Sequence, residues 1–398
     1  MAQTTFEFPP AAENAVPAGA LRCAATPGAA QPAEAGAIDR TGFAIGWDHA
    51  HHRLTPPLGH LDDHSPVRQG WAAGRAAFGA RTLRPTAAVR QWLALRLQAW
   101  QQGQPFEEVQ VNPSFLARID ADECPVRRTP LLLCSGTDDD ATVARLNGRA
   151  AYAAGNLAVV SAPAAAALSA SDWAQALANA DRLADGVASP IAGLDQAAWL
   201  RLAVLASFAT PLPHGQAALL PLRVLPPNRV RVINPVQALQ VVLTLQFSAA
   251  GYARRLLGLA ALMPSSEVRQ AFQIFMHTLL ARRLAVGPAP TPAELRRALE
   301  DSWADPLVNR RWQRLALRLG AADCERLLQR AASRQLVVGG SRWLSAETAT
   351  EGWDIADGAR APRPEQPGLP ERPDQAACSA SAARPGSIRS RGSQKLAS

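Results

Sequence analysis

Apolar residues recur at intervals of three and four positions through most of the region between residues 86 and 335. This spacing places them on one face of an α-helix. The first predicted helix covers residues 86–101 and ends before Gly103 and Pro105. Further helices are predicted to begin at Asp195, at Asn234-Pro235, at Ser265 or Ser266, at Thr291-Pro292, at Asp305-Pro306 and near Asp323. The pattern therefore predicts a mainly α protein, built as an array of helices with short connections.

Strand signals are weak by comparison. Val224-Leu225 and Val230-Arg231-Val232 flank Pro226-Pro227-Asn228, which predicts a small hairpin. Residues 157–160 predict another short strand.

The two ends of the chain differ in composition from the middle. Residues 1–37 and 345–398 are rich in small residues and proline and lack apolar periodicity, which predicts disordered segments. Between them we expect an N-terminal domain over residues 38–190 and an arginine-rich helical domain over residues 191–344.

The chain is basic, with a formal net charge of +8 and a pI of about 10.2. Of its 41 basic residues only Lys395 is a lysine, so the remaining 40 are arginines. Such an excess favours an anionic partner. A GC-rich coding sequence produces the same bias without any selection for binding, so composition leaves both explanations open.

The cysteines and the hydropathy bear on location. Cys23, Cys124, Cys134, Cys324 and Cys378 are dispersed and include no CxxC pair, so we expect no zinc site of the usual spacing and no disulfide framework. The first residues lack a secretory signal, and no apolar run reaches membrane-spanning length. We therefore expect a cytoplasmic protein with no membrane contact and no cofactor.

Three short motifs occur between Cys124 and Ser161. They are Cys124-Pro125-Val126, then residues 142–147 with Arg145, and then Tyr152-Ala153-Ala154-Gly155-Asn156-Leu157. In this order they resemble a degenerate form of the ββα-metal core of HNH-type endonucleases, over roughly residues 124–168. The resemblance implies a small ββα-like insertion in the N-terminal half. In it, Cys124, Tyr152, Gly155 and Asn156 are scaffold residues, and Asn156 braces the loop by hydrogen bonds to the backbone.

The groups that perform HNH chemistry are missing from this segment. Such a site holds a divalent cation against the phosphate and uses a histidine as general base. Here Ala144 stands where the resemblance predicts Asp or His, and no histidine occurs between Cys124 and Ser161. Alanine neither binds a metal nor moves a proton, so we expect no metal and no catalysis. We interpret Asp138-Asp139-Asp140 as a solvated loop.

Five of the seven histidines lie close together in the sequence. They are His49, His51, His52, His60 and His64. Two histidines and a carboxylate suffice for zinc or non-haem iron, and a metal-dependent enzyme using the His49–His64 cluster is one alternative. Prolines and Gly59 interrupt the segment, which favours an extended polar loop instead.

Arginines are dense in the C-terminal half, with 14 arginines and 7 acidic residues between Gly251 and Gln335. After Pro306, helical geometry places Arg310, Arg314 and Arg318 on adjoining parts of one flank. Such a stripe can lie along phosphates, or it can be a solvated face. The residues that we predict to bind nucleic acid are Arg127, Arg128, Arg145, Arg310, Arg311, Arg314 and Arg318.

Together these features give a lead hypothesis and an alternative. The lead is a non-catalytic protein associated with nucleic acid, in which arginine-rich helices contact the backbone without sequence specificity. The alternative is a helical scaffold that binds protein and has no nucleic-acid role.

Overall fold

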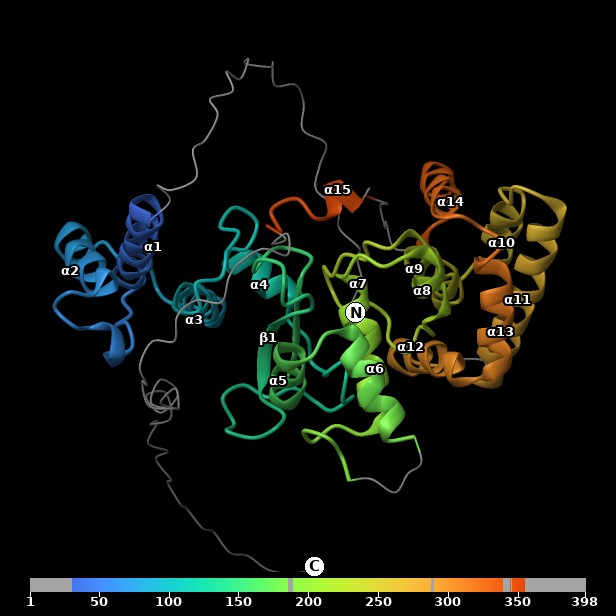
Figure 1. Cartoon of the computed structure of the whole chain (residues 1–398), viewed down its shortest axis with the longest axis horizontal. Helices are drawn as coiled ribbons and strands as arrows, with labels where there is room; N and C mark the ends of the chain where they lie inside the picture. Colours follow the sequence, from blue (N-terminus) through green and yellow to red (C-terminus); the bar gives the residue numbers. More distant parts are fainter. Residues whose placement is uncertain (1–30, 185–188, 288–289, 339–343, 345, 355–398) are drawn as a thin grey trace, which may run out of the picture. The chain divides into compact units, whose positions relative to one another are not determined.

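The computed structural model describes residues 31–184, 189–287, 290–338, 344 and 346–354. These residues are mainly helical, and among them one antiparallel pair of strands forms the sheet (Figure 1). The predicted fold class, mainly α with a small strand-containing insertion in the N-terminal half, is confirmed. All of the described residues belong to one compact unit, Met1–Arg360.

The region before the strands is helical. Its elements are α1 (Gln31–His51), η1 (Leu58–His60), α2 (Pro66–Phe78), α3 (Ala87–Gln101) and α4 (Pro113–Ile119). α3 begins where the sequence pattern predicts, because the side chain of Thr86 accepts a hydrogen bond from the N–H of Val89. The buried Arg96 of α3 forms ion pairs with Asp48 of α1 and with Glu108, which hold α3 against α1.

The backbones of α1 and α2 touch because glycines occupy their crossing. A Cβ atom added to Gly46 of α1 would lie 1.8 Å from the carbonyl oxygen of Val67. One added to Gly70 of α2 would lie 1.9 Å from the carbonyl oxygen of Phe43. The crossing therefore admits no side chain at either position.

The strands form a hairpin that leads into a helix. β1 (Ala141–Arg145) pairs antiparallel with β2 (Leu157–Ser161), with Ala141 opposite Ser161 and Arg145 opposite Leu157. The strand predicted at residues 157–160 is thus confirmed. The next elements are α5 (Ala162–Ala170), α6 (Trp173–Arg182), α7 (Gln196–Phe208) and α8 (His214–Leu219). α5 packs against both strands.

The C-terminal half contains a further series of helices. They are α9 (Pro235–Leu245), η2 (Gln246–Ser248), α10 (Tyr252–Ala260), α11 (Ser266–Ala285), α12 (Pro292–Asp301), η3 (Ser302–Ala304), α13 (Pro306–Ala316), α14 (Ala321–Ser333) and α15 (Ala346–Ala349). The predicted starts are confirmed by caps: the side chains of Ser265, Thr291 and Asp305 each accept a hydrogen bond from the first turn of their helix. The helix after Asn234 also begins as predicted, but the Asn234 amide bonds to the preceding loop and to Gln237.

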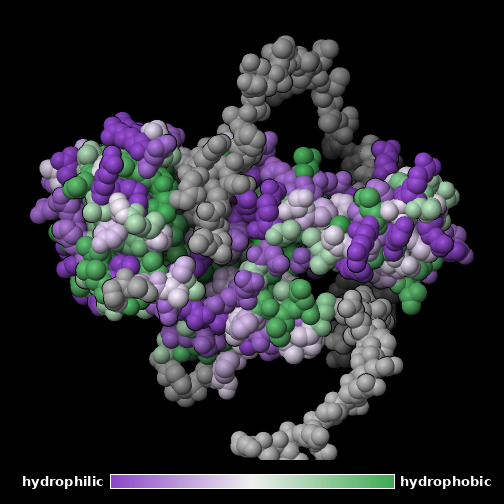
Figure 2. Space-filling model, turned by 180° about the vertical axis from the view of Figure 1, so that it is seen from behind, coloured by the Kyte–Doolittle hydropathy of each residue, from purple (hydrophilic) through white to green (hydrophobic). Residues whose placement is uncertain are grey.

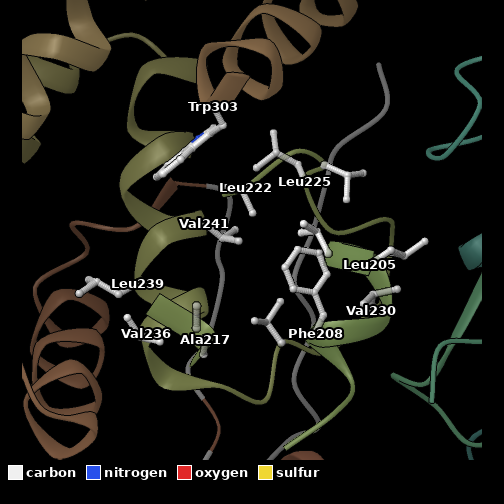
Figure 3. Close-up of a cluster of buried hydrophobic side chains, with 14 of the residues drawn as sticks. Leu205, Phe208, Ala217, Leu222, Leu225, Val230, Val236, Leu239, Val241 and Trp303 are labelled. Atoms are coloured by element: carbon white, nitrogen blue, oxygen red, sulfur yellow. The ribbon is translucent and has the colours of Figure 1, made fainter. Parts of the chain in front are cut away.

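One large hydrophobic core connects the hairpin with the C-terminal helices. Figure 3 shows part of it, where Leu205 and Phe208 of α7 lie opposite Val236, Leu239 and Val241 of α9. Trp303 of η3 closes this cluster from above in the view. The core is continuous across residues 190–191, where the two expected domains, 38–190 and 191–344, meet.

The hairpin predicted around Pro226-Pro227 is not formed. Residues 224–232 are not a strand pair, although Val224, Leu225 and Val230 are buried in the core. Prolines lack the N–H donor that a strand ladder requires, and the segment instead bonds to other elements, for example through the N–H of Arg231 to the carbonyl of Gly155.

The described structure extends into both segments that the composition predicts to be disordered. α1 begins at Gln31, within the predicted segment 1–37, and residues 1–30 lie outside the described residues. In the predicted tail 345–398, α15 forms and Trp353 is fully buried, while residues 355–398 are not described. Near the C-terminal end, the fold includes residues of the predicted tail because the large aromatic side chain of Trp353 is buried in the core.

We predict that Gly46→Ala lowers the free energy of unfolding by about 1–3 kcal/mol, because the added methyl group forces α1 away from α2. Chemical denaturation followed by circular dichroism measures the change. Gly59→Ala is the matched control, since a Cβ there meets no atom within 4 Å. Equal stability of the two variants would contradict the proposed close contact.

Candidate functional site

The segment that resembles an HNH core folds as strand, turn, strand and helix. The side chain of Asn156, at 0% exposure, fixes the turn. Its Oδ1 accepts the N–H of Asn147 at 2.8 Å, and its Nδ2 donates to the carbonyls of Asn147 (3.1 Å) and Ala151 (3.0 Å). The amide thus uses its acceptor and both donors on the backbone of one loop, as the resemblance implies.

The turn lies inside the protein. Its tip, at Gly148 and Arg149, is exposed, and all residues from 150 to 161 are buried. Trp353 covers it, because its indole Nε1 donates to the carbonyl of Ala154 at 3.0 Å and its own carbonyl accepts the N–H of Ala151. This part of the hairpin therefore offers no open surface to a phosphate backbone.

Arg231 covers the turn at Gly155. Gly155 has φ +93°, and a Cβ atom there would lie within 3.0 Å of three side-chain carbons of Arg231. The Arg231 guanidinium, buried with its residue 5% exposed, donates to the carbonyl of Ala349 (2.8 Å) and to Gln110 Oε1 (2.9 Å). Both the backbone angle and the close approach require glycine at position 155.

Cys124 is tied to the far end of β2. Its thiol donates to Ser161 Oγ at 3.3 Å, and its sulfur accepts the N–H groups of Ser161 (3.3 Å) and Arg127 (3.4 Å). Because β2 runs from Leu157 to Ser161, Cys124 and Asn156 lie at opposite ends of this strand. Each stabilises one end of the hairpin.

The described cysteines differ in state. Cys124 and Cys324 are free thiols, and burial raises the pKa of the Cys324 thiol to about 12. Cys134 is disulfide-bonded.

Tyr152 and Arg145 form a contact beside the turn. The Arg145 guanidinium lies 4.5 Å from the centre of the Tyr152 ring, and the phenol donates to Gln102. Burial raises the pKa of Tyr152. Arg145 also donates to Gln104 Oε1 and to the carbonyl of Ala150, both at 3.0 Å. This predicted binding residue is therefore engaged within the protein.

Arg127 and Arg128 are engaged as well. Arg127 pairs with Asp139 at 3.1 Å, and Arg128 pairs with Glu300 (3.1 Å) and Asp301 (2.7 Å) of α12. The Arg128 contacts join the loop before β1 to the C-terminal half.

The aspartates at 138–140 organise their own loop. Asp140 accepts hydrogen bonds from the hydroxyl and N–H of Ser135 and from the N–H of Gly136, and the Ser135 hydroxyl contributes most to lowering its pKa. Among the described residues no three His, Cys, Asp or Glu side chains are placed to hold a metal ion.

The predicted stripe on α13 is exposed, but it is shorter than predicted. Arg310 and Arg314 lie on the exposed side of the helix, whereas Arg311 donates to Thr278 of α11. The helix ends at Ala316, and Arg318 follows in the next turn, where it is also exposed. Within the described part of the chain, the side chains of Arg310, Arg314 and Arg318 make no hydrogen bond or ion pair.

The histidines between positions 49 and 64 contact different groups of the protein. His49 is inside α1, buried, with Nδ1 2.8 Å from the carbonyl of Ile45, and the His51 ring stacks on Phe78. His60 lies edge-on to Trp100. The segment thus begins as helix, contrary to the extended loop that its composition favours, because α1 continues to His51 before Pro56 is reached.

Apolar side chains on the surface are scattered along the chain. The large exposed ones are Phe43, Leu58, Leu83, Val109, Leu132, Leu133, Leu219, Leu257, Ile274, Leu284 and Leu317. On the face shown in Figure 2, separate hydrophobic areas interrupt a hydrophilic surface. No helix in the described ranges has both the length and the apolar character needed to cross a bilayer.

No protein-family model, curated protein or solved structure matches the chain. The resemblance to HNH nucleases therefore stays a prediction based on its own residues.

The roles of Arg231, Trp353 and Glu300, which together fix the hairpin and the loop before it, could not be predicted from the sequence. Arg231 lies in a segment that resembles a strand, and Glu300 is one of many charges on an amphipathic helix. Trp353 was the one of these residues whose burial the sequence could have indicated, because it is a large aromatic residue within a segment poor in apolar residues.

We predict that Asn156→Ala lowers the free energy of unfolding by at least about 2 kcal/mol. The substitution leaves the N–H of Asn147 and the carbonyl of Ala151 without their partner, each costing about 1–3 kcal/mol, while the carbonyl of Asn147 keeps the N–H of Ala150. Denaturant titration measures the loss. Asn179→Ala is the control, because the Asn179 side chain accepts one bond, from Arg182. A loss no larger than that of the control would show that the brace is dispensable.

We predict that the protein loses stability as the pH falls below about 6.5. Burial lowers the pKa of His49, His52 and His60 in the folded state, so the unfolded chain takes up protons first as the solution is acidified. Their contribution is complete above the unfolded pKa and is lost progressively toward the lower folded values. Urea unfolding between pH 8 and pH 5 measures this dependence.

His49→Gln removes the most buried of these three groups and should flatten the dependence. His277→Gln, at an exposed position of α11, is the control. An unchanged pH profile in His49→Gln would contradict the assignment.

Proposed function

We propose that the protein binds the sugar–phosphate backbone of nucleic acid without cleaving it, and that Arg310, Arg314 and Arg318 form the contact surface. The observation that carries this proposal is that these three guanidinium groups are exposed and have no partner among the described residues. Arg127, Arg128, Arg145 and Arg311 are not part of the proposed surface, because their side chains are engaged internally.

The charge around the surface supports an anionic ligand. From Pro306 to Ala322 the sequence contains no acidic residue. Asp305, at the start of α13, is paired with Arg282. The positive charge is therefore not neutralised locally, and arginine forks bind phosphate oxygens bidentately.

The hairpin supports a role without catalysis. Its turn is buried, Ala144 is buried within β1, and the segment contains no histidine that could act as base. In this proposal the HNH-like element is a structural unit that positions the helices.

We predict that the triple variant Arg310→Ala, Arg314→Ala and Arg318→Ala weakens duplex binding. It should also reduce the slope of log K against log salt by about 3, one for each lost phosphate contact. Fluorescence anisotropy with a labelled duplex at several salt concentrations measures both effects. Arg254→Ala, at an exposed arginine of α10 without a partner among the described residues, is the control. Absence of wild-type binding at low salt, or an unchanged slope in the triple variant, would refute the proposal.

One observation favours the protein-binding alternative. Leu317 is 55% exposed and lies between Arg314 and Arg318 in the sequence. An apolar side chain gains nothing from contact with a charged phosphate backbone, whereas a protein partner can bury it. If the partner is protein, Leu317→Gln should lower recovery of nuclease-insensitive partners in a pull-down. If the partner is nucleic acid, Leu317→Gln should leave duplex affinity unchanged.

A further inference from the structure

Three arginines from distant parts of the sequence lie near the adjacent carboxylates of Glu300 and Asp301. Arg128 comes from the loop before β1, Arg201 from α7, and Arg223 from the connection between α8 and α9. Arg201 is 8% exposed, and its Nε donates to the carbonyl of Val126 at 2.6 Å, two residues before Arg128. We call Arg128, Arg201 and Arg223 the guanidinium cluster.

The connection that carries Arg223 is fixed to the same carboxylate as Arg128. The N–H of Leu225, two residues after Arg223, donates to Glu300 Oε1 at 2.9 Å. Arg128 binds Glu300 Oε2 at 3.1 Å, and Arg296 lies 3.3 Å from Oε1. Both oxygens of Glu300 are therefore occupied.

The other carboxylates near the cluster are also engaged. Asp301 accepts Arg128 at 2.7 Å, and Asp195 caps α7 by accepting the N–H of Ala198. The terminal amino groups of Arg201 and the whole Arg223 guanidinium have no acceptor within the described residues. Within the described residues, neither Arg201 nor Arg223 thus has a carboxylate at ion-pair distance.

The partial burial of these charges makes their isolation costly. Burial lowers the pKa of Arg201 and of Arg223, and the charge of Arg128 lowers both further, whereas Asp301 raises that of Arg223 and Asp195 and Glu300 raise that of Arg201. Buried charges in proteins are normally met by a counter-charge, because removing them from water costs several kcal/mol each. An anion between the guanidinium groups supplies that counter-charge.

We propose that the guanidinium cluster binds a phosphate-type oxyanion, either inorganic phosphate or the phosphate of a monoester. A phosphate at neutral pH carries close to two negative charges, which matches the two uncompensated guanidinium groups. Arginine guanidinium groups bind pairs of phosphate oxygens, so Arg201 and Arg223 supply the donors. Arg128 is held between Glu300 and Asp301 by ion pairs and adds positive charge beside them.

The test measures the thermal unfolding midpoint of the full chain in sodium phosphate and in sodium chloride at equal ionic strength. Calorimetric titrations with inorganic phosphate and with a nucleoside monophosphate follow, with the unphosphorylated nucleoside as blank. We expect phosphate to raise the midpoint above that in chloride. Arg223→Gln should reduce this difference to the general stabilising effect that phosphate has on folded proteins, and should weaken phosphate binding by about tenfold or more, since a charge-assisted hydrogen bond is lost. Arg254→Gln is the matched control.

Equal midpoints in phosphate and chloride would overturn the proposal, as would a wild-type phosphate response in Arg223→Gln. If Arg223→Gln does not fold, Arg223→Lys keeps the charge but loses the fork, and an unchanged response in that variant also overturns the proposal. Binding of the monophosphate but not of inorganic phosphate identifies an ester as the ligand.

The outcome is separable from duplex binding on α13. Arg223→Gln should leave duplex affinity unchanged, and the α13 triple variant should retain the phosphate response. Failure of one proposal therefore leaves the other standing.

Discussion

The polar backbone of the buried turn after β1 is the constraint on which the rest of the structure depends. A buried N–H or carbonyl without a partner costs free energy comparable to a lost hydrogen bond. The turn meets this requirement with the Asn156 amide, the indole of Trp353 and the backbone of Arg231. Each partner comes from a different part of the sequence, so satisfying one short loop brings three segments together.

Arginine side chains extend this connection through the interior. Arg231 reaches the segment before α4 and the end of α15, Arg128 reaches α12, and Arg96 links α1 with the loop after α3. A planar guanidinium donates in several directions at once, whereas an ammonium is a point charge with a strong preference for water. The interior therefore uses arginine in a way that lysine would not reproduce.

The helical array could be predicted from the sequence because its signals are local. Thr86, Ser265, Thr291 and Asp305 each cap a helix that begins at the next residue. The partners of the hairpin could not be predicted in this way. Whether Trp353 packs on Ala154, nearly 200 residues away, depends on the shape of the folded core rather than on neighbouring residues. The pattern of residues 224–232 was ambiguous for the same reason, since burial in a loop and burial in a strand produce the same apolar sequence.

The structure divides the arginines into groups that bear differently on the origin of the basic composition. A coding bias toward arginine explains exposed residues such as Arg310 and Arg314 as readily as binding does, because solvation makes them nearly neutral for folding. It does not explain interior arginines in the same way, because a buried charge without a partner would be selected against on stability alone. Arg96, Arg128 and Arg231 meet that requirement through partners within the chain. Arg201 makes one hydrogen bond, to the carbonyl of Val126, and the side chain of Arg223 makes none among the described residues, so a bound anion would supply the acceptors that these two guanidinium groups lack.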